Sequence, residues 1–530
     1  MLDDIDRIEV IRGPGAAMWG ANAVNGVINI VTRGAADTRG GLVRVEAGHF
    51  GEQGAVRYGG TAGAADYRVY SQWTGRNQSL IVPGTGANDA SHSTTTGFRA
   101  DWSSRPGVFT LEGDFTAGQA RALWPNFNLQ TIARDPIAND PTDTQGGHLL
   151  GRWTRTRASG ASLQIQSFVD IEGRQEPIGD YHRGAFDVDG QYHTAIGARQ
   201  DLVAGGGYRY IDEAFEGHAG FSLTPSDNRS SLLTAFVQDE IGMFGHRLAV
   251  TLGALVQYDS DFGAGLQPTA RVMWKASPRQ RVWAATSRAL RTPSLQDLGI
   301  RVDYPPAPGA GGLPLLVTVL GNPATETESL VDAEAGYRLE IGTAASIDVT
   351  GYVGRYSHLQ TQEARAPIVQ FIPSPGILVI SQFGNLLEAT TRGLEVAGHW
   401  QVVPAWRLDA SGTAFHVTPR LAAASQDLAA VSADGSAPRT QWQVRSSYSP
   451  DVHATLDLAI FHVGRLAQFQ MEAYTRADIG AEWRFTNRVS VRAIGQNLFD
   501  AAHPEFGGAG SLLLATQVPR SASLRLRWAF

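Results

Sequence analysis

The last twelve residues of this chain alternate between apolar and polar side chains, as a β-strand with two unlike faces does. The apolar face carries Ala522, Leu524, Leu526, Trp528 and Phe530, and the polar face carries Ser521, Ser523, Arg525 and Arg527. Successive side chains of a strand point to opposite faces, so this pattern predicts a strand. A half-buried strand of a soluble sheet shows it too. What restricts the fold is that the pattern recurs along nearly the whole chain.

The recurring segments share a small or polar second face, which suits a water-filled interior better than a packed one. Examples are the segments 163–172, 248–258 and 478–485. We count roughly 22 such segments, most of them at least as long as the nine to eleven residues that a tilted membrane strand needs. The sequence therefore predicts an all-β fold, a transmembrane antiparallel β-barrel of about 22 strands.

The connections between these segments alternate between short turns and long polar or Pro-rich loops. The long loops are expected near residues 77–92, 119–145, 174–184, 213–228, 291–327, 361–386, 419–437 and 498–518. If Phe530 ends at the short-turn rim, counting backwards puts every short turn on that rim, which is the asymmetry of a transmembrane barrel. The alternatives are a large secreted β-sandwich or a solenoid. A propeller would repeat at a fixed period, and none is evident.

Composition excludes several classes of site. The chain has no cysteine, which rules out disulfides, thiolate metal sites and Cys nucleophiles. The net charge of −7 gives no general attraction to nucleic acid. No apolar run approaches the eighteen residues of a helical membrane span. The acidic start, Met1 to Asp6, does not resemble a secretory signal, so either the protein is cytosolic or its true beginning is missing.

The first 33 residues differ from the rest, because two short apolar stretches flank a small, Gly-rich loop. We expect three parts: residues 1–33, a linker at 34–40 and the barrel at 41–530. A barrel of this width has a lumen that its own side chains do not fill, and such barrels hold a plug. Residues 1–33 are the candidate for it.

Several motifs carry a family resemblance. The stretches 6–14 and 19–33 look like the end of the plug domain of TonB-dependent outer-membrane receptors. Further matches along the barrel are Ser287 to Leu295, Gly321-Asn322-Pro323, Thr391 to Val396 and Asn497-Leu498-Phe499-Asp500. The terminal Phe530, with Trp528, resembles the signal that the barrel-assembly machinery reads. Together these matches cover essentially the whole chain.

The resemblance implies a monomeric receptor in the outer membrane of a Gram-negative bacterium, surrounded by lipid and lipopolysaccharide. It implies active uptake of a scarce nutrient, most often an iron–siderophore chelate, with energy supplied through TonB. Cobalamin, haem, copper chelates and oligosaccharides enter through similar barrels. In this family the plug is longer, follows a signal peptide and is preceded by a TonB-contacting segment. We therefore expect most of the plug to be missing here, and this chain by itself to be neither exported nor coupled to TonB.

The resemblance also suggests how the plug is fastened. A polar wall cannot hold a plug by hydrophobic burial, whereas charged pairs in a partly desolvated lumen can. Arg12 stands at a Gly-Pro turn of the plug, and Glu334 and Glu395 stand in two barrel segments. In the family a plug arginine in this turn meets barrel glutamates. We hypothesise that Arg12 pairs with both of these glutamates.

The chain shows no motif for catalysis, since Gly-x-Ser-x-Gly, His-Glu-x-x-His and P-loop patterns are absent. We expect no enzyme activity, cofactor or metal site. Aromatic residues of the outer loops are candidates for stacking on a small-molecule or metal-chelate ligand, although loop aromatics also pack loops together. They are Trp124, Phe127, Tyr181, Tyr304 and Phe506. A passive porin, an outer-membrane enzyme and an adhesin are the competing functions.

Overall fold

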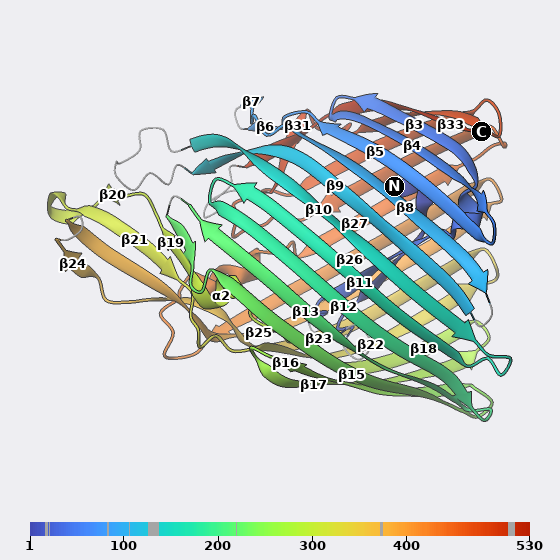
Figure 1. Cartoon of the computed structure of the whole chain (residues 1–530), viewed down its shortest axis with the longest axis horizontal. Helices are drawn as coiled ribbons and strands as arrows, with labels where there is room; N and C mark the ends of the chain where they lie inside the picture. The colour runs from blue at the N-terminus through green and yellow to red at the C-terminus, as the bar shows by residue number, and fades with distance from the viewer. Residues whose placement is uncertain are drawn as a thin grey trace.

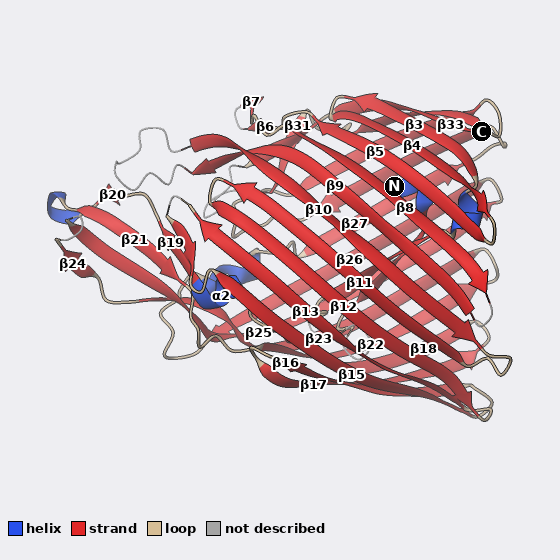
Figure 2. Ribbon diagram, in the orientation of Figure 1, coloured by secondary structure: helices blue, strands red, loops and turns tan. Residues whose placement is uncertain are grey.

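The computed structural model describes residues 1–15, 20, 22–81, 84–104, 107–125, 137–218, 220–371, 375–506 and 515–530. One antiparallel sheet closes on itself to form a barrel of 22 strands (Figures 1 and 2). This confirms the predicted all-β barrel. Among the described residues no helix is both long and apolar enough to cross a bilayer.

The barrel strands pair in chain order. They are β3 (Gly40–Gly48), β4 (Gly51–Ala62), β5 (Ala65–Arg76), β8 (Ser91–Ser104), β9 (Gly107–Pro125), β10 (Ile137–Thr156), β11 (Ser162–Glu176), β12 (Gly179–Ile196), β13 (Gln200–Gly217), β15 (Asp227–Met243), β16 (Leu248–Asp259), β17 (Gly263–Ser277), β18 (Gln280–Arg291), β22 (Glu328–Ile341), β23 (Ala345–Ala364), β25 (Gly376–Val403), β26 (Trp406–Leu421), β27 (Thr440–Tyr448), β28 (Ala454–Val463), β29 (Tyr474–Arg484), β30 (Val489–Gln496) and β33 (Ser521–Ala529).

The last strand closes the barrel against the first. In this pairing Leu42 lies opposite Ala529 and Gly48 opposite Ser523. At the rim, the Gly41 N–H donates to the Phe530 carbonyl at 2.7 Å, and the Phe530 N–H donates back at 2.9 Å. Closure matters because backbone groups in lipid have no water to bond to, and an open sheet edge leaves a row of them unpaired.

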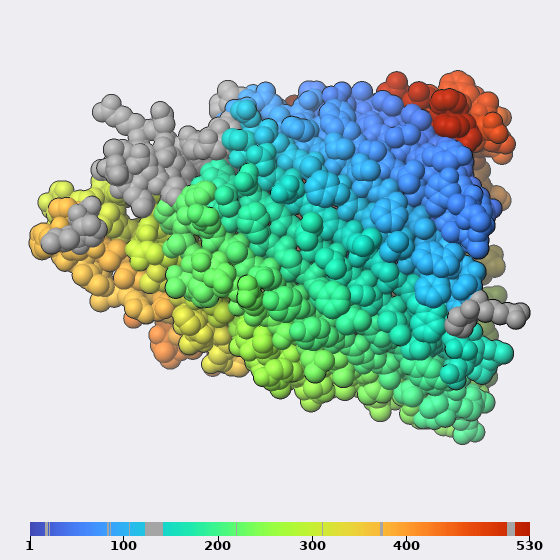
Figure 3. All heavy atoms as spheres, in the orientation of Figure 1, coloured from blue at the N-terminus to red at the C-terminus, as the bar shows by residue number. Residues whose placement is uncertain are grey.

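The apolar side chains of the barrel strands lie on its outer face. On β33, Leu524, Leu526 and Trp528 are about half exposed, while Ser523 and Arg525 on the other face turn toward the lumen. The same alternation runs round the wall, and the buried apolar residues are mostly alanines. Figure 3 shows side chains covering the wall over the strands in view. An oily outer surface around a polar interior is the arrangement that lipid requires.

The two ends of the barrel differ (Figure 1). Short turns lie at the end where the chain finishes, and strands extend beyond the wall at the other. These outer elements are β6 (Leu80–Ile81), β7 (Thr85–Gly86), β14 (Phe221–Leu223), α2 (Leu295–Gly299), β19 (Ile300–Asp303), β20 (Ala307–Pro308), β21 (Pro314–Leu320), β24 (Ile368–Gln370), β31 (Ala502–Phe506), β32 (Thr516–Pro519) and two 3-10 turns at Ala310–Gly312 and Ala430–Gly435.

Some of the predicted long loops are strand instead. The segment 174–184 is a tight turn, because β11 continues to Glu176 and β12 begins at Gly179. The segment 361–386 is largely the outer part of β23 and β25. These outer ends have water on both faces, so they lose the apolar alternation while their backbones stay paired.

Residues 1–33, which we call the luminal segment, form a small sheet of their own. A 3-10 turn at Leu2–Asp4 leads into β1 (Ile5–Arg12), which pairs antiparallel with β2 (Gly26–Thr32). A second 3-10 turn at Ala35–Thr38 then connects to β3. The segment contacts the wall through side chains of its own and of the barrel interior.

The two faces of the wall predict opposite responses to one substitution. Leu394 on β25 is 49% exposed on the outer face, and Thr413 on β26 lies opposite Glu395 on the inner face. We expect Leu394→Arg to lower the free energy of unfolding by about 2–4 kcal/mol, because it places a charge in the apolar band. Thr413→Arg should cost much less. Denaturant titration of the barrel folded into lipid vesicles measures both, and equal losses would contradict the assigned faces.

Candidate functional site

The tip of the luminal segment is tied to the wall by an ion pair. Arg12 ends β1, and its Nη1 contacts Glu395 Oε2 on β25. Gly13 follows with φ +74°, a left-handed conformation that glycine adopts readily, and so turns the chain at this point. The Arg12 side chain is 61% exposed and Glu395 is 20% exposed. Water therefore screens this pair considerably.

Glu334 lies near the same turn but is differently placed. It stands on β22, and its Oε2 is 3.6 Å from the point where a Cβ on Gly13 would be. Among the described residues Glu334 makes no ion pair within 4.0 Å. The structure thus brings Arg12 to Glu395 and leaves Glu334 beside the turn.

The loop between β1 and β2 also forms hydrogen bonds with the wall through Asn22 and Asn25. The Asn22 N–H donates to the Leu290 carbonyl at 2.9 Å, and the Thr292 N–H donates to Asn22 Oδ1 at 3.1 Å. The Tyr356 hydroxyl donates to Asn25 Oδ1 at 3.0 Å. These bonds, with the Arg12 pair, attach the tip to β18, β23 and β25.

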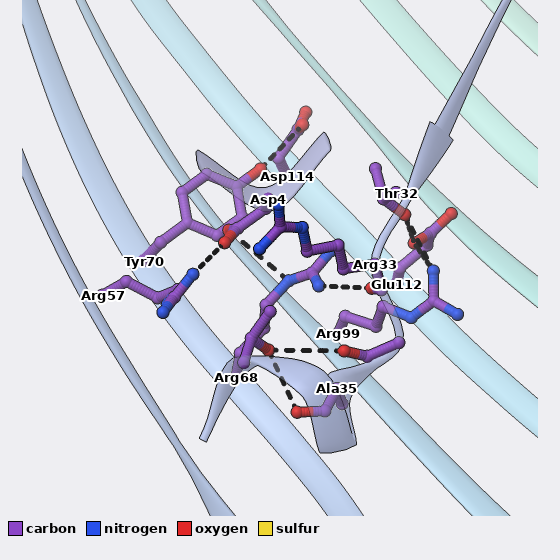
Figure 4. A network of polar contacts seen from close by, with 12 residues as sticks. Asp4, Thr32, Arg33, Ala35, Arg57, Arg68, Tyr70, Arg99, Glu112 and Asp114 are labelled. Carbon is purple, nitrogen blue, oxygen red and sulfur yellow. Dashed lines mark hydrogen bonds and ion pairs between the residues drawn. The ribbon is translucent and has the colours of Figure 1, made fainter. Parts of the chain in front are cut away.

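The base of the luminal segment is held by two aspartates and a group of inward-facing arginines. Asp3 accepts from Arg44 Nη1 at 2.9 Å, and Arg527 Nε lies 3.4 Å from its other oxygen. Asp4 pairs with Arg57 Nη1 and lies 3.6 Å from Arg68 Nε. Figure 4 shows the Asp4 side of this cluster. The Asp4 side chain is only 3% exposed, so this cluster is far drier than the tip.

A second group of polar contacts extends the base toward β8 (Figure 4). Arg68 Nη1 donates to the Arg33 carbonyl at 2.6 Å, and Arg99 Nη1 donates to the Thr32 hydroxyl at 2.8 Å. The Ala35 N–H donates to Asp101 Oδ2 at 2.7 Å. Both ends of the luminal segment and the turn that follows it are thus bonded to neighbouring strands.

The sequence analysis did not find this base cluster, although a signal was present. Alternation points arginines inward from β33, β3, β4, β5 and β8, and one on each strand lies in or beside the base cluster. These residues are Arg527, Arg44, Arg57, Arg68 and Arg99. Taken alone, the acidic start argues only against a signal peptide. Taken together with these five inward arginines on adjacent strands, the acidic start predicts where the base of the luminal segment is held.

Glu9 illustrates the exposed face of the luminal segment. Arg7 Nε donates to Glu9 Oε1 at 2.6 Å, and Asn29 Nδ2 donates to Oε2 at 2.8 Å. The hydrogen bond from Arg7, supported by Asn29, lowers the pKa of Glu9 below its usual value. Glu9 therefore stays ionised to lower pH than an ordinary glutamate.

Two of the predicted ligand-stacking aromatics, Tyr181 and Tyr304, have side chains among the described residues. Tyr181 lies on β12, and its hydroxyl donates to Glu213 Oε2 at 3.3 Å. Tyr304 packs against the outer cluster of Phe221 and Val302. Phe127 lies outside the described residues, as do the side chains of Trp124 and Phe506.

A cavity of about 490 Å³ opens among the outer ends of β23 and β25. Its lining includes Glu326, His358, Glu363, Arg365 and Asn385. Its volume suits a small ligand. Its side chains include hydrogen-bond donors and acceptors, and both acidic and basic groups. Among the described residues no three His, Cys, Asp or Glu side chains gather closely enough to hold a metal ion.

Comparison with known proteins agrees with this architecture. The sequence model of the family described as "TonB dependent receptor-like, beta-barrel" matches residues 32–498. The iron-regulated outer membrane virulence protein of Vibrio cholerae serotype O1 is 22% identical over 529 residues, covering 94% of this chain and 76% of the relative. The ferric enterobactin receptor of Pseudomonas aeruginosa is 56% identical over 41 residues, covering 8% of this chain and 6% of the relative.

Solved structures share the fold. A mutant of the ferric enterobactin receptor PfeA from Pseudomonas aeruginosa, in complex with enterobactin, superimposes with a TM-score of 0.80 at 15% identity, covering 100% of this chain and 86% of that one. The siderophore receptor PirA from Acinetobacter baumannii superimposes with a TM-score of 0.79 at 15% identity, covering 100% of this chain and 85% of that one. The closed 22-strand barrel, its oily exterior and the family match together identify this chain as a member of the TonB-dependent receptor family, whose barrel lies in the Gram-negative outer membrane.

Proposed function

We propose that this protein is a receptor for active uptake of a scarce nutrient, with iron–siderophore complexes as its substrate class. The observation that carries the proposal is a wide, wet barrel whose lumen holds a segment attached to the wall at both ends. The iron-related names of the relatives support the choice of substrate class. The cavity at the outer ends of β23 and β25 is our candidate for first contact with the ligand.

The two attachments suggest a division of labour within the luminal segment. The tip pair of Arg12 and Glu395 is exposed and therefore weak, as surface ion pairs are. The base pairs of Asp3 and Asp4 are buried, so breaking one leaves an unpaired charge out of water. A ligand arriving from the outer end shifts the tip, while a pull by TonB from the short-turn end acts on the base. We assign the tip to signalling and the base to anchoring.

The substrate class is tested by growth and uptake. We expect a strain lacking this gene to grow poorly on at least one ferric siderophore as sole iron source and to take up less radiolabelled iron from it. The gene supplied on a plasmid should restore both. Normal growth on every iron source would remove iron from the proposal.

The runner-up function is a passive, porin-like channel. Protein purified from the outer membrane of its own host and placed in a planar bilayer separates the two. A receptor with an occupied lumen is expected to stay nearly closed until denaturant loosens the luminal segment. Steady conductance from the first insertion would favour the porin.

The tip pair is tested by a double-mutant cycle. We expect Arg12→Gln and Glu395→Gln each to reduce the hydrogen-exchange protection of β1 and to couple by about 0.5–1 kcal/mol, because each removes the same exposed pair. Arg7 bonds to Asp6 and Glu9 within the luminal segment, so Arg7→Gln is the matched control. It should be additive with Glu395→Gln. Additivity in both cycles would show that the Arg12 contact is energetically silent.

The base is tested by a pair of neighbouring aspartates. Asp4→Asn should cost about 3–5 kcal/mol, because it leaves Arg57 and Arg68 unpaired in a dry site. Asp6 is 51% exposed, and its ion pair among the described residues is with Arg7, so Asp6→Asn should cost under about 1 kcal/mol. Hydrogen exchange at β1 and β2 measures both. Similar protection in the two variants would mean that the base does not anchor the segment.

A further inference from the structure

Two of the sequence motifs, residues 287–295 and 321–323, meet at one buried carboxylate at the outer end of the barrel. Asp297 stands in α2, and its side chain is 10% exposed. Its Oδ2 accepts from Arg291 Nη2 of the first motif at 3.2 Å. Its backbone carbonyl accepts from the Asn322 N–H of the second motif at 2.9 Å. Asp297 therefore joins the two motifs.

The surroundings of Asp297 hold it in one position. The Ser294 N–H donates to its Oδ2 at 2.9 Å, and Gln360 Nε2 donates to its Oδ1 at 3.1 Å. A Cβ on Gly321 would lie 2.8 Å from the backbone nitrogen of Gly299, so the second motif packs directly on the end of α2 with no room for a side chain. Because packed groups transmit displacement, a shift of the second motif has to move α2 with it.

The first motif is bonded to the tip of the luminal segment. Arg291, which pairs with Asp297, stands between Leu290 and Thr292 along the chain. The Asn22 N–H donates to the Leu290 carbonyl, and the Thr292 N–H donates to Asn22 Oδ1. The residues on either side of Arg291 thus hold the tip. A shift of Asp297 reaches Asn22 through one ion pair and the neighbouring peptide units.

The second motif forms part of the wall of the cavity of about 490 Å³. Asn322 lines this cavity, and its Nδ2 donates to the carbonyl of Phe383, another lining residue, at 3.0 Å. Gln382 also lines it, and its Nε2 donates to the Gly321 carbonyl at 3.2 Å. Among the described residues, those that line the cavity belong to the barrel and its outer elements. An occupant seated there would therefore act on the luminal segment through the wall.

A bulge in β23 makes a second connection between the cavity and the tip. The pairing of β23 with β25 shifts register just after Tyr356. His358, in this bulge, lines the cavity and has φ +60°, a left-handed conformation that is uncommon for residues other than glycine. On one side of it the Tyr356 hydroxyl donates to Asn25 Oδ1, and on the other side stands Gln360, which donates to Asp297. Strained backbone of this kind clusters at ligand sites and switch regions.

We propose that the cavity is coupled to the tip of the luminal segment through the barrel wall, with Asp297 and Tyr356 as positioning residues. An occupant that displaces the cavity wall shifts the bonds to Asn22 and Asn25, and so loosens the tip without touching it. Coupling between distant sites is carried by packed and hydrogen-bonded groups, which the two connections supply. The inference rests on the proposed function only in taking this cavity as the first contact of the ligand.

A covalent label can take the place of the natural ligand in the test. The chain has no cysteine, so Ala324→Cys, at an exposed position lining the cavity, takes a methanethiosulfonate nitroxide label alone. Hydrogen exchange of the full chain in detergent, read by mass spectrometry on peptides covering residues 20–30, compares labelled with unlabelled protein. We expect the label to speed exchange at the tip about fivefold or more. The same label on Gln175→Cys, exposed at the outer end of β11, should leave exchange unchanged.

The double variant Asp297→Asn/Tyr356→Phe weakens both connections and nearly keeps the size of each side chain. On this background the label at Ala324→Cys should speed exchange at the tip by less than about twofold, as expected of uncoupled sites. A merely structural role would speed exchange in the labelled and unlabelled protein alike. The ratio of the two rates would then stay as in the parent.

Two further variants serve as matched controls. Asp303 bonds to Arg301 and Thr318 within the outer elements, so Asp303→Asn alters a neighbouring carboxylate outside the two connections. Tyr352 lies four residues from Tyr356 on the same face of β23, and among the described residues its hydroxyl makes no hydrogen bond. Asp303→Asn and Tyr352→Phe should each keep the parent's ratio of labelled to unlabelled exchange.

Two results would overturn the proposal. A ratio near one in the labelled parent would show that the cavity and the tip are not coupled, and an unchanged ratio in the double variant would show that coupling takes another route. Heat-dependent migration on a gel confirms folding. If the double variant does not fold, Tyr356→Phe alone decides, since it should lower the ratio. The label replaces any siderophore, so growth on iron sources tests the proposed function independently of these ratios.

Discussion

The structure depends on one requirement, which is that every backbone group facing lipid must find its hydrogen bond within the sheet. The pairing of β33 with β3 meets it, because it removes the two edges that an open sheet would leave. Closure also fixes the position of Phe530 at the rim, since its backbone is hydrogen-bonded to that of Gly41. A sheet of this size then encloses a lumen too wide for side chains alone to fill. The polar character of the inward face of the wall follows from that width.

Within a wet lumen the usual order of forces is reversed. Apolar packing holds little, and the β1–β2 sheet leaves Ile8, Val10, Ile28 and Ile30 more than half exposed. Ion pairs and hydrogen bonds attach the luminal segment instead. They are stronger where water is more completely excluded. The Asp4 cluster is enclosed by strands, whereas in the tip pair Arg12 is 61% exposed and Glu395 is 20% exposed. The same chemical bond therefore serves as an anchor at one end and as an easily broken contact at the other.

Much of the fold could be predicted because a strand's alternation is local, and residues 519–530 show it without knowledge of any neighbour. The outer extensions could not be predicted, because β11 and β12 beyond the membrane are wet on both faces and resemble a loop in composition. The Arg12 contact came from a family resemblance rather than from spacing. To predict the Asp3 and Asp4 cluster, one must know which strands surround residues 1–4. One must also know where along the barrel axis the arginine of each strand lies. Alternation predicts which face of the sheet a residue lies on but not its position along the barrel axis.

β25 has 28 residues and serves three environments at once. Its outer part runs parallel to β21, its outward face carries Arg392 into the lipid, and its inward face carries Glu395 to Arg12. Only two residues separate the lipid-facing arginine from the lumen-facing glutamate, and the period of two decides which side each one sees. A single inserted or deleted residue between them would exchange the faces of everything on one side of it. Length changes in even steps keep every face, whereas an odd step requires a β-bulge of the kind present where the outer part of β23 pairs with β25.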